Sequence, residues 1–569
     1  MRRTSAVVAG LVVVALAAAG CSSAGTASSS STAGLSASKA GLAGLPGPSA
    51  NGRVAPAPGP VPVAAPLTGG NGIDLASAAT LPPLPSSWVQ DELSVTGTAV
   101  SYRAVGALGS NGRFHLAPGP SASYETRIVV RRPRSPSAFN GVVVVEWLNV
   151  SGGLDAAPEY TYLRNELVRA GYAWVGVSAQ YIGIEGGPVA VSTPVSSLGG
   201  AGKGIVAEDP ARYGKLHHPG DAFSYDIFTQ VGRLLRHPRG VDPLGPLHPK
   251  VLLAAGESQS AIMLTTYIDG VQPLEHEYDG FLVHSRGGGA APLGQAGKGI
   301  NIAQTIGGPP VRIRTDLHAP VLMVETESDV AGLLDYLPAS QPDTDRIRTW
   351  EVAGTSHVDV YQLGSVAKLF GCTTPVNAGP DHFVVEAALV QLTRWADGGP
   401  PPPHAPRFVT RNGKYVRSSL GIVEGGIRTP PVEVPTEVLS GHASPGGSIA
   451  CLLAGSTTPI PTSTLARLYP SRAVYLREYA KATDEAIASG FVLPQSRAAM
   501  LAMAQPDKVP VGPGPGGGGG PGGGRVKARG ADGSGDDLPA RQRAAPAGAG
   551  RVSPDSAGVV QRQNISFPS

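Results

Sequence analysis

Short apolar runs alternate with segments of helical periodicity through the middle of this chain, from about residue 71 to about residue 505. Several of the runs are apolar almost throughout, as expected for strands that are buried on both faces of a sheet. The apolar runs are residues 127–131, 142–148, 173–178, 251–255, 281–284, 321–325 and 349–352. Apolar residues recur at spacings of three and four in residues 160–170 and 223–235, and a third helical segment, 258–267, follows the run 251–255 after one tight turn. This alternation predicts an α/β fold, with a mostly parallel central sheet and helices on both of its faces.

The two ends of the chain differ in composition from this middle part. Residues 22–75 are mainly Ser, Ala, Gly and Pro with almost no charge, and residues 506–569 include a run of nearly pure Gly and Pro. Such segments bury too little apolar surface to offset the entropy lost on ordering. We therefore expect a disordered linker over 22–75, one catalytic domain over 76–505 with loop or cap insertions, and a disordered tail over 506–569.

The N-terminus resembles an export signal. Met1-Arg2-Arg3 is followed by an apolar stretch, Ala6 to Ala19, that is too short for a confident membrane-spanning helix. Small residues then precede Cys21, as in a bacterial lipobox, although Ala18 stands where Leu is usual. We expect residues 1–21 to direct export and Cys21 to carry a lipid that anchors the protein to the outer face of the cytoplasmic membrane. The alternative is cleavage nearby and secretion.

Charge and cysteine content exclude several classes of function. A net charge of +3 is too small to indicate nucleic-acid binding. The chain has no Gly-rich dinucleotide motif and no Cys/His spacing typical of a metal site, so no cofactor or metal is expected. In an oxidising compartment Cys372 and Cys451 either pair or remain free thiols, and the sequence does not decide between the two.

The most informative stretch is the apolar run 251–255 with the five residues that follow it, Gly256-Glu257-Ser258-Gln259-Ser260. A serine at a tight turn from strand to helix presents its hydroxyl above the sheet, at the positive end of the helix. This pattern predicts Ser258 as a nucleophile and the Gln259 N–H as an oxyanion donor. Ser260 departs from the usual Gly, and the alternative is that Ser258 only caps a helix.

A serine nucleophile needs a base and an orienting acid, which follow it in the order acid then His in this type of fold. Asp329 lies a few residues past the run 321–325, and Glu327 is the competing acid. His357 follows the run 349–352 and a flexible Gly, downstream of both carboxylates. We therefore predict Ser258, Asp329 and His357 as a triad. His284 ends an earlier run and is expected to line the pocket.

A second oxyanion donor is expected in the loop after the run 142–148, where small polar and Gly residues follow the strand. Backbone N–H groups in such a loop approach a substrate oxygen closely. Val150 and Ser151 are the candidates, and a plain turn is the alternative.

Five stretches together resemble one bacterial family of serine hydrolases, the alpha/beta hydrolase domain proteins. They are residues 143–158, 256–260, 353–357, 377–380 and 451–459. The resemblance spans about residues 80 to 504 and implies the α/β-hydrolase fold and a serine nucleophile. It does not imply a substrate, because fold and family do not by themselves give function.

Three functions are compatible with these residues. The first is hydrolysis of a small-molecule carboxylic ester through an acyl-enzyme on Ser258. The second is hydrolysis of an amide or peptide by the same residues, and the third is a non-catalytic, surface-anchored binding protein on a hydrolase scaffold. Segments 181–221, 287–315 and 465–503 are candidates for the walls or lid of the pocket.

Overall fold

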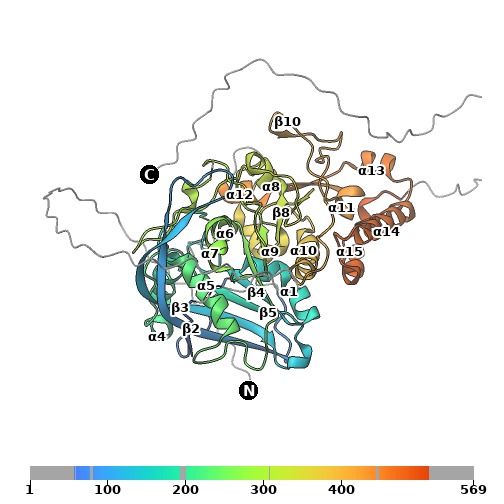
Figure 1. Cartoon of the computed structure of the whole chain (residues 1–569). Helices are drawn as coiled ribbons and strands as arrows, with labels where there is room; N and C mark the ends of the chain where they lie inside the picture. Colours follow the sequence, from blue (N-terminus) through green and yellow to red (C-terminus); the bar gives the residue numbers. More distant parts are fainter. Residues whose placement is uncertain are drawn as a thin grey trace, which may run out of the picture. The chain divides into compact units, whose positions relative to one another are not determined.

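One sheet forms the centre of the protein in the computed structural model, which describes residue 57 and residues 59–76, 81–192, 200–306, 308–443 and 448–511. Among these residues nine strands pair in the order β1-β2-β3-β5-β4-β6-β7-β8-β9 (Figure 1). The strands are β1 (Val63–Pro66), β2 (Trp88–Ala104), β3 (Leu116–Pro133), β4 (Val142–Trp147), β5 (Ala173–Val177), β6 (Val251–Glu257), β7 (Gly280–His284), β8 (Val321–Thr326) and β9 (Ile347–Val352).

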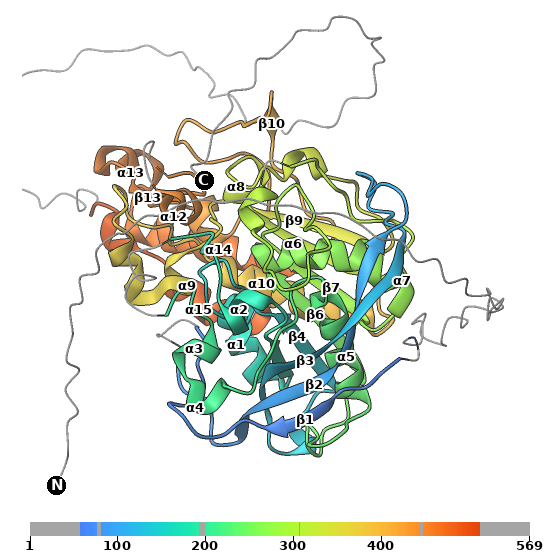
Figure 2. The same cartoon turned by 90° about the vertical axis from the view of Figure 1, so that its left-hand side faces the viewer.

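The sheet is parallel over its larger part. Strands β5, β4, β6, β7, β8 and β9 pair in parallel, whereas β1, β2 and β3 pair antiparallel, and β3 joins β5 antiparallel. The long hairpin of β2 and β3 curves along one side of the sheet (Figure 2). The predicted mostly parallel α/β architecture is confirmed. β2 was not predicted, because its mixture of polar and apolar residues reflects partial exposure rather than full burial.

Helices cover both faces of the sheet. The α-helices are α1 (Pro158–Ala170), α2 (Tyr181–Glu185), α3 (Ile205–Glu208), α4 (Pro210–Tyr213), α5 (Ser224–Arg236), α6 (Gln259–Thr266), α7 (Gln272–Glu275), α8 (Glu327–Val330), α9 (Val360–Leu363), α10 (Asp381–Ala396), α11 (Pro430–Glu433), α12 (Ile449–Ala454), α13 (Thr462–Leu468), α14 (Arg472–Ala488) and α15 (Arg497–Ala502). Strand β4 shows why the strands are apolar throughout. Val143 and Val145 join the core that includes α5 and α6, while Val142 and Val144 join the core that includes α1 and α10.

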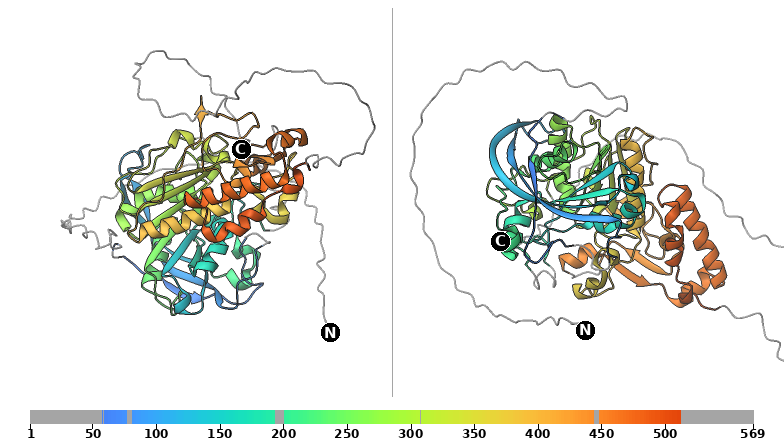
Figure 3. Two further views of the ribbon diagram at one scale, coloured as in Figure 1. Left: turned by 90° about the vertical axis from the view of Figure 1, so that its right-hand side faces the viewer. Right: turned by 90° about the horizontal axis from the view of Figure 1, so that it is seen from below.

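The C-terminal helices do not cover the site, contrary to the expectation for residues 465–503. α13 and α14 form a small core with Tyr469, Tyr475 and Tyr479. Val492 and Met500 then pack against Phe383 of α10. Figure 3 shows α14 and α15 alongside α10. The apolar faces of these helices therefore pack against one another and against α10, and the helices do not form a lid.

Both predicted domain boundaries need adjustment. Strand β1 lies inside the segment assigned to the linker, because its backbone pairs with β2 and this pairing does not require apolar side chains. At the other end, residues Pro506–Lys508 form a 3-10 turn, and Val509 is buried against the core of α13 and α14. The signal segment with Cys21 and most of the predicted tail lie outside the described residues. No helix within the described ranges is long and apolar enough to cross a membrane.

Candidate active site

Ser258 occupies the turn between β6 and α6. Its backbone angles, φ 62° and ψ −121°, belong to a region that non-glycine residues rarely adopt and that is found mainly where function requires strain. The turn is tight, because a Cβ added to Gly256 would lie 2.9 Å from the Cβ of Ser260. Ser260 therefore fits at the position where Gly is usual because Gly256 leaves the space for it.

The structure brings Ser258, His357 and Asp329 into one hydrogen-bonded chain. His357 Nε2 lies 2.7 Å from Ser258 Oγ, and His357 Nδ1 lies 2.7 Å from Asp329 Oδ1. His357 and Asp329 are buried, whereas Ser258 is partly exposed. The three side chains come from the ends of three separate segments, after β6, β8 and β9, which the parallel sheet gathers at one edge.

The second carboxylate oxygen of Asp329 is held by three donors. The N–H and the hydroxyl of Thr326 and the hydroxyl of Ser285 each donate to Oδ2 at 2.7 Å. Burial alone would raise the pKa of Asp329, but the charge of His357 and these hydrogen bonds outweigh it and leave the pKa below its usual value of 3.8. For His357, burial lowers the pKa, but the charge of Asp329 and of Glu257 raises it above 6.5.

Glu327, the competing acid, faces away from His357. Its Oε1 accepts the N–H of Gly354 at 2.8 Å, and its Oε2 accepts the N–H of Gly441 at 3.1 Å. Arg417 lies 3.3 Å from the same Oε2. Glu327 thus joins the loop that carries His357 to the loop after β12 (Glu437–Ser440).

The three predicted oxyanion donors differ in where their N–H groups point. Gln259 is the first residue of α6, and the first N–H groups of a helix have no partner within the helix. The N–H of Val150 points toward the same turn and donates to Gln259 Oε1 at 3.2 Å. The N–H of Ser151 instead donates to Asn149 Oδ1 at 2.8 Å. Gln259 and Val150 are therefore better placed than Ser151.

Two side chains that sequence reasoning missed hold this loop beside Ser258. Asn149 donates through Nδ2 to the carbonyl of Glu257 at 3.1 Å. Gln180 accepts from Gln259 Nε2 at 2.5 Å and from the indole N–H of Trp147 at 3.0 Å. Asn149 thus ties the loop to the residue before Ser258, and Gln180 orients the Gln259 side chain that accepts the N–H of Val150. For Asn149 the signal was its place directly after an apolar strand, whereas for Gln180 no sequence signal existed.

His284 does not line a pocket, contrary to expectation. It is buried, with Nδ1 2.9 Å from Glu159 Oε1 and Nε2 3.1 Å from Asp381 Oδ2. Burial lowers the pKa of His284, but the two carboxylates outweigh that effect and raise it well above 6.5. The imidazole thus pairs with one oxygen of each carboxylate, and the carbonyl of His284 accepts the N–H of Ser258 at 3.0 Å, which links this cluster to the turn of the nucleophile.

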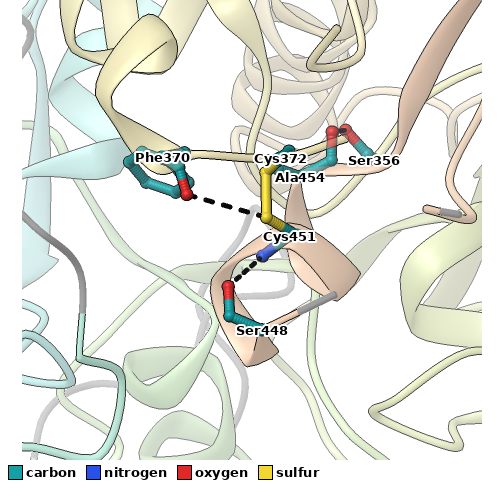
Figure 4. Close-up of a disulfide and its surroundings, with 6 residues drawn as sticks. All are labelled: Ser356, Phe370, Cys372, Ser448, Cys451 and Ala454. Carbon is teal, nitrogen blue, oxygen red and sulfur yellow. Dashed lines mark hydrogen bonds between the residues drawn. A yellow bond between two sulfur atoms is a disulfide. The ribbon is translucent and has the colours of Figure 1, made fainter. Parts of the chain in front are cut away.

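Cys372 and Cys451 form a disulfide beside the His357 loop (Figure 4). It joins the segment after the 3-10 turn Gly364–Phe370 to α12. The carbonyl of Leu453 in α12 accepts the N–H of Val358 at 3.2 Å, directly after His357 in the sequence. The hydroxyl of Ser356, directly before His357, donates to the carbonyl of Val358 at 2.7 Å and lies 3.3 Å from the carbonyl of Ala454. Of the two options that the sequence left open, the structure has the bonded pair.

Two hollows share lining residues, and the smaller one lies beside the candidate oxyanion donors. A small enclosed one is lined by residues that include Val150, Ser151 and Gln259. A larger one, about 810 Å³, is lined mainly by apolar residues of the segment after β7 and shares Ile300 and Asn301 with the first. Most ligand pockets are apolar hollows of about this size.

Several features of this arrangement fit nucleophilic attack on a carbonyl. His357 can take the proton of Ser258, Asp329 holds the imidazole in one orientation, and N–H groups surround the place where an oxyanion would form. Within the described ranges no group of three His, Cys, Asp or Glu side chains is placed to hold a metal ion.

Comparison with known proteins finds a match to one family. A family model described as "Alpha/beta hydrolase domain" matches residues 60–502. No curated protein matches the chain.

Solved structures with some likeness include a Rhizomucor miehei esterase, the glucuronoyl esterase from Solibacter usitatus and Est1E from Butyrivibrio proteoclasticus. Their sequence identities are 12%, 9% and 10%, and their TM-scores are 0.25, 0.25 and 0.27. They cover 53%, 52% and 52% of this chain and 84%, 82% and 99% of their own. Overlaps this weak carry no argument about function.

Proposed function

The chain belongs to the alpha/beta hydrolase domain family, and on that premise we propose that it is a serine hydrolase that cleaves carboxylic esters through an acyl-enzyme on Ser258. One observation carries this proposal, the unbroken line of hydrogen bonds from Ser258 Oγ through His357 to Asp329, each 2.7 Å long. The strained backbone of Ser258 supports it, because such strain persists mainly at functional sites.

In the proposed first step Ser258 Oγ attacks the ester carbonyl carbon while His357 Nε2 takes the hydroxyl proton. The resulting oxyanion accepts hydrogen bonds from the N–H groups of Gln259 and Val150, the second of which must turn from Gln259 Oε1 or be shared with it. The imidazolium then gives its proton to the leaving alkoxide oxygen as the ester C–O bond breaks. In the second step water gives a proton to His357 Nε2 as its oxygen attacks the acyl carbonyl carbon. The bond from that carbon to Ser258 Oγ then breaks, His357 returns the proton to Ser258 Oγ, and the acid leaves.

We place the apolar part of the substrate in the hollow of about 810 Å³. It adjoins the smaller hollow beside Gln259 through Ile300 and Asn301, and its lining includes Phe114 and Val311. Lys298 is the cation that lines it, and no carboxylate is among its lining residues. These features support an ester with an apolar acyl or aryl group and do not favour a cationic substrate.

The test is the variant Ser258→Ala, assayed on p-nitrophenyl esters of increasing acyl length and with a fluorophosphonate probe. Both turnover and labelling should disappear. Ser260→Ala is the matched control, because Ser260 is a buried serine of the same turn whose Oγ has no hydrogen-bond partner in the described part of the chain. Undiminished turnover in the Ser258 variant would sink the proposal.

Two further assays distinguish the other two functions. Matched ester and amide substrates with the same acyl group distinguish an esterase from an amidase or peptidase. A correctly folded wild-type protein that no serine-directed probe labels would instead indicate a binding protein.

We further propose that the protein is exported and held at the outer face of the cytoplasmic membrane through a lipid on Cys21. The support is the basic, apolar and small-residue order of residues 1–21. Metabolic labelling with an alkyne fatty acid should mark the wild-type chain and not Cys21→Ser. Recovery of unlabelled wild-type protein in the medium would indicate secretion instead.

A further inference from the structure

A second carboxylate, besides Asp329, approaches the imidazole of His357. Glu257 Oε1 lies 3.5 Å from His357 Nε2, the same nitrogen that lies 2.7 Å from Ser258 Oγ. At 3.5 Å the contact is an interaction between charges rather than a hydrogen bond. Glu257 precedes the nucleophile at the end of β6, so the backbone that positions Ser258 also positions this carboxylate.

Within the described part of the chain, no other role of the Glu257 carboxylate is evident. Its side chain is 3% exposed. Its Oε1 has no hydrogen-bond partner within the described residues, although buried carboxylates are normally paired. Five titratable groups from the surrounding elements interact with it electrostatically: Tyr162 and Glu159 of α1, His284 of β7, Asp329 of α8 and His357. His284 already pairs with Glu159 and Asp381, so His357 is the histidine whose positive charge Glu257 can stabilise.

We propose that Glu257 is a positioning residue that stabilises the imidazolium of His357 from the Nε2 side, as Asp329 does from the Nδ1 side. This inference rests on the proposed esterase function. When Ser258 Oγ bonds to the substrate carbonyl carbon, its O–H bond breaks and the proton moves to Nε2. The positive charge that then forms lies between two carboxylates, and the proton passes on to the leaving alkoxide as the C–O bond breaks.

Ionisation of Glu257 makes this support dependent on pH. Burial raises the pKa of Glu257 to about 7, against the opposing effect of His357 and His284. Below that pH the carboxyl is largely neutral and contributes little to the imidazolium. Above it the anion is present and raises the pKa of His357, so the support is strongest on the alkaline side of neutrality.

The experiment compares Glu257→Gln with wild type in the full chain by two readouts. The first is the pKa of His357, followed by NMR of nitrogen-15-labelled histidine side chains. The second is the pH profile of kcat/KM on an ester. Removing a nearby anion should lower the pKa of His357 by about one pH unit or more. The acid limb of the profile should move by the same amount. The plateau of kcat/KM above the limb should fall about tenfold for each unit by which the pKa of His357 falls.

Glu386→Gln is the matched control. Glu386 is also buried, on α10, and burial raises its pKa to about 8, but its hydrogen bond goes to Ser496 rather than to His357. This variant should leave both readouts unchanged. Glu257→Asp keeps the charge on a shorter side chain and should return the acid limb toward its wild-type position.

The outcomes separate this inference from the proposed function. A folded Glu257→Gln protein whose His357 pKa and acid limb both match wild type would overturn the inference, even if its melting temperature fell. If Glu257→Gln does not fold, Glu257→Asp is the test. This variant keeps the charge, so an acid limb that moves as far as expected for loss of the charge would overturn the inference too. If the wild type hydrolyses no ester, the proposed function fails, but the NMR titration still tests the pairing of Glu257 with His357.

Discussion

Asp329 and Glu327 lie two residues apart after β8, yet only Asp329 meets the imidazole of His357. Asp329 Oδ1 is 2.7 Å from His357 Nδ1, whereas Glu327 Oε1 accepts the backbone N–H of Gly354 at 2.8 Å. Both carboxylates are fully buried. One therefore contacts the ring of the histidine and the other contacts the loop that carries the histidine.

This difference predicts opposite kinetic and structural profiles for two conservative variants. Asp329→Asn should lower kcat by about 10⁴-fold with little loss of folded protein, because the amide no longer stabilises the imidazolium or holds the correct tautomer. Glu327→Gln should lower kcat far less and should lower the melting temperature, because it weakens buried contacts. Steady-state kinetics and thermal melts measure both. A larger loss of kcat in the Glu327 variant would assign the acid role to Glu327.

The pH dependence of activity follows from the raised pKa of His357. The base must be neutral to accept the proton of Ser258, and its pKa lies above 6.5 because of Asp329 and Glu257, against the effect of burial. The rate should therefore rise with pH along an acid limb that lies above 6.5 and fall as pH drops through it. Asp329, whose pKa lies below 3.8, stays ionised over that range. A kcat/KM profile that is flat from pH 5 to 8 would contradict this assignment.

Gly256 and Ser260 should show a size-dependent coupling. Gly256→Ala places a Cβ 2.9 Å from the Cβ of Ser260 and 3.0 Å from Leu264, so we expect a loss of about 1–3 kcal/mol in stability, as for an overpacked core. Adding Ser260→Gly should recover part of that loss. Chemical denaturation of the single and double variants measures the coupling. If the stability changes of the two single variants simply add in the double variant, the contact between positions 256 and 260 does not cause the loss.

The disulfide should support both stability and the position of His357. It closes a loop with a sequence separation of 79, for which the chain-entropy model gives about 4–5 kcal/mol. Cys372→Ser with Cys451→Ser should therefore lower the melting temperature. It should also lower kcat, because a carbonyl of α12, that of Leu453, accepts the N–H of Val358 directly after His357. Wild type under a reducing agent should follow the double variant. If the double variant is less stable but has an unaltered kcat, the disulfide stabilises the fold and does not position His357.

Asn149 should matter for catalysis although it contacts no reacting atom. It donates to the carbonyl of Glu257 and accepts from the N–H of Ser151, and so it fixes the loop that carries Val150. Asn149→Ala should lower kcat by about 10²-fold, the loss typical of one oxyanion donor, with KM changed less. Asn165→Ala, a change on the exposed side of α1, is the control. A change in KM alone would mean that the loop binds substrate rather than the oxyanion.

The amino-acid sequence by itself determined most of the central fold. Strands such as β4 and β6 are buried on both faces, and this leaves continuous apolar runs that periodicity detects. The turn at Ser258 was also evident, because a strand, small residues and a helix follow one another directly. Features of this kind depend on neighbours in the sequence, and local physical chemistry is enough to predict them.

The tertiary structure alone decided how distant side chains meet. The sequence left Asp329 and Glu327 as rival acids, and only the packing of the loops after β8, β9 and β12 turned Glu327 toward Gly354 and Gly441. Similarly, His284 ends a strand as a pocket residue would, but buried acids from α1 and α10 enclose it. The direction of a side chain depends on groups that lie many tens of residues away, and no local pattern carries that information.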